Sequence, residues 1–134
     1  MTELITEDLR PYKYFSDHFP RPYLIMIGHH KINAFDSYNI ASQSSIINDY
    51  VQANYKNAFT ISDEITMRAF NQRKSKKILI ENIKTDLILS HGGNIGNIRN
   101  ELLLEISNLS KDDLNKRFKI FLVLNKYFNL IQIR

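Results

Sequence analysis

The chain has 134 residues, 43% of them hydrophobic, with 18 Lys and Arg against 14 Asp and Glu and no cysteine. These values predict one globular domain, residues 1–134, and exclude disulfides, thiolate metal sites and a cysteine nucleophile. The acidic N-terminus and the short apolar runs argue against a signal peptide and a membrane span, so we expect a cytoplasmic protein without a membrane partner.

The first predicted elements are an irregular N-terminal segment, residues 1–22, and a strand. Pro11, Pro20 and Pro22 exclude a long helix here and leave room for at most a short one between Pro11 and Pro20. Residues 23–27 are an apolar run that ends at Gly28. This run predicts a buried strand, although so short a run also fits a buried helical turn.

The middle of the chain is predicted to be mainly helical. Helical spacing of apolar residues indicates a helix over residues 35–55. A second helix is predicted to start at Ser62 as N-cap, because Asp63 and Glu64 would follow in its first turn. Residues 78–89 fit either two short strands or a continuation of that helix.

The C-terminal part gives the strongest helical pattern. Apolar residues recur at three- and four-residue steps over 94–131, interrupted where Ser110 and Asp113 match a capping box. We predict an antiparallel helical pair here. The predicted fold class is therefore α+β and helix-dominated, with a small sheet or hairpin around 23–27 and 78–89. An all-α bundle is the alternative.

Charge is divided unevenly along the chain. Residues 1–67 carry a net charge of −3 and residues 68–134 a net charge of +7. Clustered cations can bind phosphates, so the sequence predicts a nucleic acid or an acidic protein or nucleoprotein complex as partner. The alternative is the solvated face of amphipathic helices. The predicted binding residues are Arg68, Arg73, Lys74, Lys76, Lys77, Lys116, Arg117 and Lys119.

Aromatic residues near the N-terminus alternate with basic ones. Tyr12, Tyr14 and Tyr23 could stack on bases or anchor a protein interface. The alternative is that this segment packs over the core.

Motifs for metals, nucleotides or catalysis are weak. His29 and His30 follow the predicted strand, but their spacing matches no metal-site pattern. The glycines at Gly92 and Gly93 lack the spacing of a nucleotide-binding loop. We predict no metal and no cofactor, and an enzyme using His29, His30 or His91 remains only as an alternative.

The sequence therefore predicts a small non-enzymatic binding or regulatory protein. Its 19 Ile and 14 Asn are typical of an AT-rich genome, which fits a regulator or inhibitor from a phage or mobile element, acting in the host cytoplasm. The alternative is a protein–protein interaction module or assembly subunit. It would dock through the C-terminal helix, which is apolar nearly all around at residues 121–124, and this surface could also support oligomers.

Overall fold

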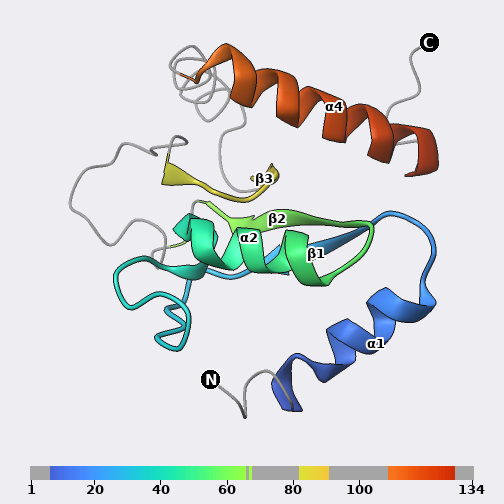
Figure 1. Cartoon of the computed structure of the whole chain (residues 1–134). Coiled ribbons are helices and arrows are strands. Elements are labelled where there is room, and N and C mark those ends of the chain that lie inside the picture. Colours follow the sequence, from blue (N-terminus) through green and yellow to red (C-terminus); the bar gives the residue numbers. More distant parts are fainter. Residues whose placement is uncertain (1–6, 66, 68–81, 91–108, 129–134) are drawn as a thin grey trace.

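The computed structural model describes residues 7–65, 67, 82–90 and 109–128. Within these residues a small parallel sheet is combined with helices (Figure 1). The elements in chain order are α1 (Arg10–His18), β1 (Tyr23–Ile27), the 3-10 turn η2 (Ala41–Gln43), α2 (Ser45–Asn54), β2 (Ala58–Glu64), β3 (Leu87–Leu89) and α4 (Lys111–Phe128).

The sheet has the strand order β1-β2-β3, and both pairs of neighbours are parallel. Tyr23 lies opposite Ala58 and Ile27 opposite Ser62, so β1 and β2 pair over five residues. The predicted α+β fold with a hairpin is therefore wrong, because parallel neighbours need a crossover connection and cannot form a hairpin. Between β1 and β2 this crossover contains α2.

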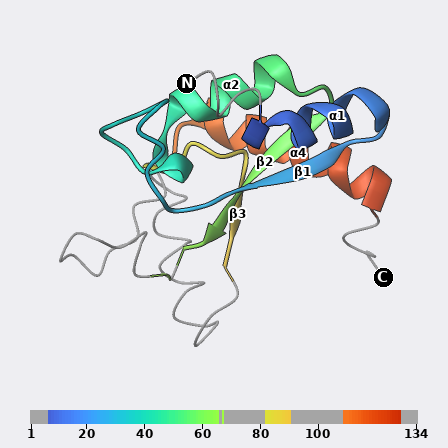
Figure 2. The same cartoon turned by 90° about the horizontal axis from the view of Figure 1, so that it is seen from below.

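Helix α2 covers one face of the sheet (Figure 2). Alternate residues of β1 are buried, which places Tyr23, Ile25 and Ile27 on the covered face. They pack in one cluster with Ile47 and Val51 of α2. A second, smaller cluster groups Ile40, Ile65 and Ile83.

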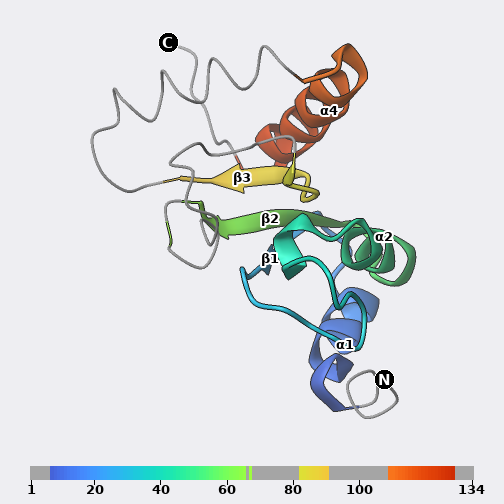
Figure 3. The ribbon, with the colours of Figure 1, turned by 90° about the vertical axis from the view of Figure 1, so that its left-hand side faces the viewer.

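Helices α1 and α4 lie at opposite ends of the strand order, α1 next to β1 and α4 next to β3 (Figures 1 and 3). Aromatic contacts hold α1 in place. The rings of Phe15 and Tyr23 pack edge to face, with their centroids 4.9 Å apart. The Ser16 hydroxyl also accepts a hydrogen bond of 2.8 Å from the backbone N–H of Lys56. The segment predicted to be irregular thus contains a nine-residue helix, which includes Pro11 in its first turn and ends before Pro20.

Several predicted elements can be compared directly with the structure. The strand at residues 23–27 is confirmed, and α2 forms the last part of the helix predicted over 35–55. The helix predicted to start at Ser62 is wrong, because residues 58–64 form β2. In the described part of the stretch 78–89, residues 82–89, β3 forms the end. The first helix of the predicted hairpin lies outside the described residues.

The start of α4 confirms Ser110 as the predicted N-cap, with Asp113 as its partner. The backbone N–H of Asp113 donates to Ser110 Oγ at 3.1 Å, and the Ser110 hydroxyl donates to Asp113 Oδ2 at 2.6 Å. Across the ranges that the structure describes, no helix combines the length and apolar character needed to cross a bilayer.

The connection between β1 and η2 is ordered by Asp36. Its carboxylate accepts hydrogen bonds from the backbone N–H groups of Tyr38 and Asn39 and from the Asn39 side chain. These bonds stabilise the charged form, and the backbone bond from Asn39 does so most. They hold the pKa of Asp36 well below its ordinary value.

This pKa shift predicts a pH-dependent contribution of Asp36 to stability. A carboxyl whose folded-state pKa is depressed stabilises the fold above its unfolded pKa of about 3.9, and the stabilisation disappears as pH falls toward the folded value. We expect Asp36→Asn to lower the urea midpoint at pH 7 and to approach the wild type as pH falls below about 4. Asp49→Asn, at an exposed position on α2, is the control. An unchanged difference down to pH 2.5 would contradict the prediction.

Candidate functional site

A polar pocket of about 440 Å³ lies between α2, the segment before β3, and α4. Two helix N-terminal regions meet at it, because Ser45 begins α2 and Ser110 caps α4. Its lining is rich in charged and hydroxyl groups. The lining residues are Ser45, Asn48, Ile83, Lys84, Thr85, Asp86, Leu109, Ser110, Asp113, Lys116 and Arg117.

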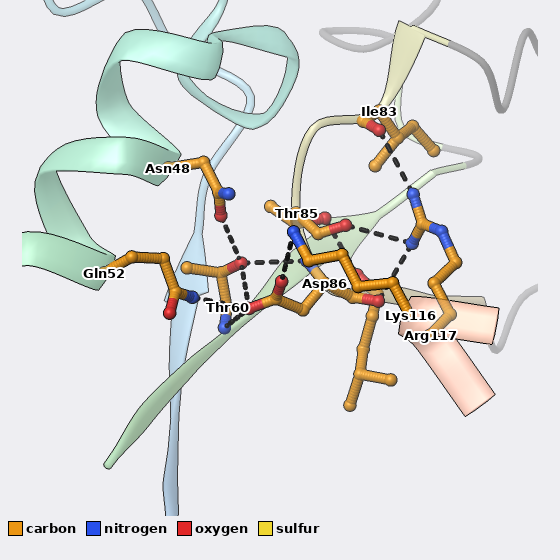
Figure 4. Close-up of polar contacts among 9 residues, drawn as sticks. Asn48, Gln52, Thr60, Ile83, Thr85, Asp86, Lys116 and Arg117 are labelled. Carbon is orange, nitrogen blue, oxygen red and sulfur yellow. Dashed lines mark hydrogen bonds and ion pairs between the residues drawn. The ribbon is translucent and has the colours of Figure 1, made fainter. Parts of the chain in front are cut away.

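Asp86 is the centre of the hydrogen-bond network beside this pocket (Figure 4). Its Oδ2 accepts from the Thr60 backbone N–H at 2.9 Å and from the Gln52 side-chain amide at 2.8 Å. Its own backbone N–H donates to Thr60 Oγ1 at 2.8 Å. The Thr60 hydroxyl lies 2.7 Å from Asn48 Oδ1 and donates to it. One buried carboxylate thus links α2, β2 and β3.

The second carboxylate oxygen of Asp86 has a different environment. Oδ1 is buried and has no hydrogen-bond partner among the described residues, and the Lys116 ammonium lies 3.6 Å from it. The Asp86 side chain is 1% exposed and that of Lys116 is 61% exposed. Lys116 therefore approaches the carboxylate from the solvent side and remains largely exposed itself.

Arg117 is directed into the protein and not toward solvent. Its guanidinium donates to the backbone carbonyls of Thr85 and Asp86, both at 2.9 Å, and to that of Ile83 at 3.3 Å (Figure 4). Desolvation by burial lowers its pKa, while the carboxylates of Asp86 and Asp113 act in the opposite direction. Arginine remains charged under such a shift. Its contacts show that Arg117 fastens α4 to the segment before β3.

His29, which follows β1, is also an interior group. It is buried, its Nε2 lies 3.0 Å from the Glu64 carbonyl oxygen, and its Nδ1 lies 2.7 Å from the Ser42 hydroxyl. These two hydrogen bonds join the ends of β1 and β2 to η2. His30 is exposed, and His91 lies outside the described residues. The residues that the structure describes contain no cluster of three or more His, Asp or Glu able to hold a metal ion.

The solvent side of α4 carries apolar groups in a row. Leu114, Phe118 and Leu122 are spaced by four residues and are all exposed, Phe118 by 60% and Leu122 by 50%. We call this row the α4 ridge. Ile120 and Leu124 are buried on the other side of the helix. The helix is thus apolar on two sides, as its composition predicted.

Three of the predicted cations, Lys116, Arg117 and Lys119, lie in the described structure, all on α4. Lys116 and Arg117 line the polar pocket, and Lys116 and Lys119 are exposed. Tyr23 is buried, Tyr12 is about half exposed, and Tyr14 is exposed and stacked on His18. The remaining predicted residues lie outside the described residues, and these are Arg68, Arg73, Lys74, Lys76 and Lys77.

Sequence reasoning missed Asp86, Thr60 and Gln52. One available signal was the position of Asp86, an acid placed directly before the apolar residues 87–89. A charge next to an apolar, partly buried strand needs a partner, so such a residue is a candidate for an internal network.

Searches against protein-family models, curated proteins and solved structures find no match to this chain. The functional argument therefore depends on the chain's own residues.

Proposed function

We propose that this chain is a binding protein, not an enzyme, and that it docks onto an acidic protein surface through the solvent side of α4. The observation that carries this proposal is the α4 ridge. Its three large apolar side chains stand next to one another in solvent, on a helix whose other side is already packed.

The size and type of these side chains support a protein partner. A contiguous row of large apolar groups is unfavourable in water and marks sites where another surface docks. Phe118 lies at the middle of the row. Aromatic residues at the centre of an interface supply a large part of its binding energy.

The charges beside the ridge support an acidic partner. Lys119 directly follows Phe118, and Lys126 lies one helical turn after Leu122, and both are exposed. The acidic residues of α4, Asp112 and Asp113, are confined to its first turn. A partner that presents carboxylates around an apolar patch would match both features and would be attracted electrostatically.

The contacts of two α4 cations favour a protein over a nucleic acid. Phosphate binding depends on cations that can approach the backbone of the nucleic acid. Arg117 cannot do so in this arrangement, because its guanidinium donates to three backbone carbonyls. Lys116 is exposed but pairs with Asp86, so a phosphate would have to compete with that ion pair.

A capture experiment with paired variants tests this function. The full chain is immobilised as wild type, as Phe118→Ala/Leu122→Ala and as Tyr38→Ala, and a lysate of the source organism is passed over each. Tyr38 is a large exposed side chain outside α4. We expect at least one acidic protein to bind the wild type and Tyr38→Ala, and to bind the double variant about thirtyfold more weakly, as loss of a hot spot implies.

Nuclease treatment and charge reversal separate this proposal from its rivals. Capture of the partner protein should persist after nuclease treatment of the lysate. Lys119→Glu/Lys126→Glu should slow the association of this partner. Capture that disappears with nuclease would support a nucleic-acid partner instead. Equal capture by the double variant and the wild type would exclude the α4 ridge as the docking surface. Light scattering on the purified protein would show whether the ridge instead joins two copies.

A further inference from the structure

A second surface lies at the other end of the sheet, between α1 and β1. It is a groove of about 360 Å³, lined by Pro11, Tyr12 and Phe15 of α1 and by residues 23–26 of β1. We call it the β1 groove. Every residue that lines it is uncharged.

The groove follows the open edge of β1. Consecutive strand residues point to opposite faces of a sheet, yet Leu24, Ile25 and Met26 all line this one groove. Residues on both faces of the sheet can line one groove only where the two faces meet, at the edge of the strand. β1 pairs with β2 on one side, and no described residue pairs with its other side.

The sequence and register of β1 lack three features that often prevent pairing with another strand. Residues 23–27 contain no proline and no charge, and their register with β2 is continuous. On the face away from the main core, Leu24 is 42% exposed and Met26 56% exposed. Parallel sheets usually bury both faces, so exposed apolar residues here indicate a surface that another chain can cover.

The wall of the groove is already fixed. Phe15 contacts the Tyr23 ring, and Ser16 bonds to the backbone of Lys56, so α1 is held beside the strand. Tyr12 and Phe15 are both about half exposed and present aromatic surface to the groove. A wall that needs no rearrangement lowers the entropic cost of binding.

We propose that the β1 groove binds an extended, uncharged apolar segment of a partner protein, which adds to the sheet as a further strand at β1. The strand edge supplies backbone hydrogen bonds. One row of alternate side chains of the segment packs against Leu24 and Met26, and Tyr12 and Phe15 form the groove wall. The uncharged lining selects against acidic and basic segments, because burying a charge without a partner is costly.

The geometry favours a peptide segment over a second copy of this chain. In each copy α1 lies beside the same edge, so two copies pairing through β1 would bring two α1 helices to one groove. An extended segment carries no such helix.

Peptide display tests the proposal. A library of random nonapeptides is selected against the full chain, with counter-selection against Leu24→Lys/Met26→Lys. Both positions are exposed, so this variant should fold. We expect enriched peptides with alternating apolar residues and no charge at their centre. Synthetic copies should shift the backbone amide signals of residues 24–26 and bind the double variant at least about tenfold more weakly.

Backbone N-methylation of the best peptide is the matched chemical control. It removes hydrogen-bond donors without removing side chains, so it should also weaken binding at least about tenfold if a strand is added. Phe118→Ala, on the α4 ridge, should leave peptide binding unchanged. No enrichment, equal binding to the double variant, or equal binding of the methylated peptide would overturn the proposal. If the wild type forms a dimer and Leu24→Lys/Met26→Lys dissociates it, the occupant of the β1 groove is a second copy of this chain and the peptide proposal is wrong.

Discussion

Asp86→Ala is expected to lower the free energy of unfolding by about 3 kcal/mol, the cost of removing the acceptor from a buried network. The Thr60 N–H and the Gln52 amide would lose their acceptor, and Lys116 would lose its carboxylate partner. Since the network joins α2, β2 and β3, the loss should affect the whole cooperative unit. Urea unfolding monitored by circular dichroism measures the change.

Two further variants make this prediction specific. Asp86→Asn keeps one carbonyl oxygen as acceptor and should cost about half as much. Asp49→Ala removes an exposed carboxylate from α2 and should change the free energy by less than about 0.5 kcal/mol. If Asp86→Ala were no more destabilising than Asp49→Ala, the network would not hold the three elements together.

Leu124→Ala should destabilise the protein by about 3 kcal/mol, as expected for a fully buried leucine. Its side chain is completely inaccessible to solvent. Leu122→Ala, two positions earlier on the same helix, removes the same atoms from a side chain that is half exposed. It should cost less than about 0.5 kcal/mol.

This pair of leucines tests the orientation of α4, on which the proposed docking depends. Thermal and urea unfolding of both variants would establish which side of the helix is packed. Equal destabilisation would mean that both sides of α4 are buried, and the α4 ridge would then be unavailable to a partner. The reverse order would place Leu124 in solvent.

Local patterns predicted the elements that carry a clear signal in consecutive residues. The apolar run at residues 23–27 forms β1, and Ser110 caps α4 with Asp113 three residues later. The capping contacts lie within three residues, and the apolar run by itself indicates a buried segment, so the sequence pattern contains both signals.

The failures involve contacts between distant residues. Ser62 followed by Asp63 and Glu64 resembles a helix start, yet these residues lie in β2. There Ser62 Oγ accepts from the Leu89 backbone N–H of the neighbouring strand. The parallel arrangement of the sheet also arises from pairing across long connections, which no short pattern encodes.

The candidate site was predicted only in part, for the same reason. The excess of cations in α4 was visible, but the direction of each side chain was not. Arg117 turns inward because three backbone carbonyls meet beside it, and their position is fixed by the segment before β3. The α4 ridge was better anticipated, since the apolar character of residues 121–124 already indicated a helix with two apolar sides.

The register of β1 with β2 also constrains how the chain folds during synthesis. Tyr23 pairs with Ala58, so about 35 residues must follow before the first bond of the sheet can form. Because synthesis adds about 5–20 residues per second, β1 waits roughly 2–7 s before the residues of β2 have been made. Because such distant pairing also slows folding in solution, nascent chains that end before Glu64 should depend on chaperones to stay soluble.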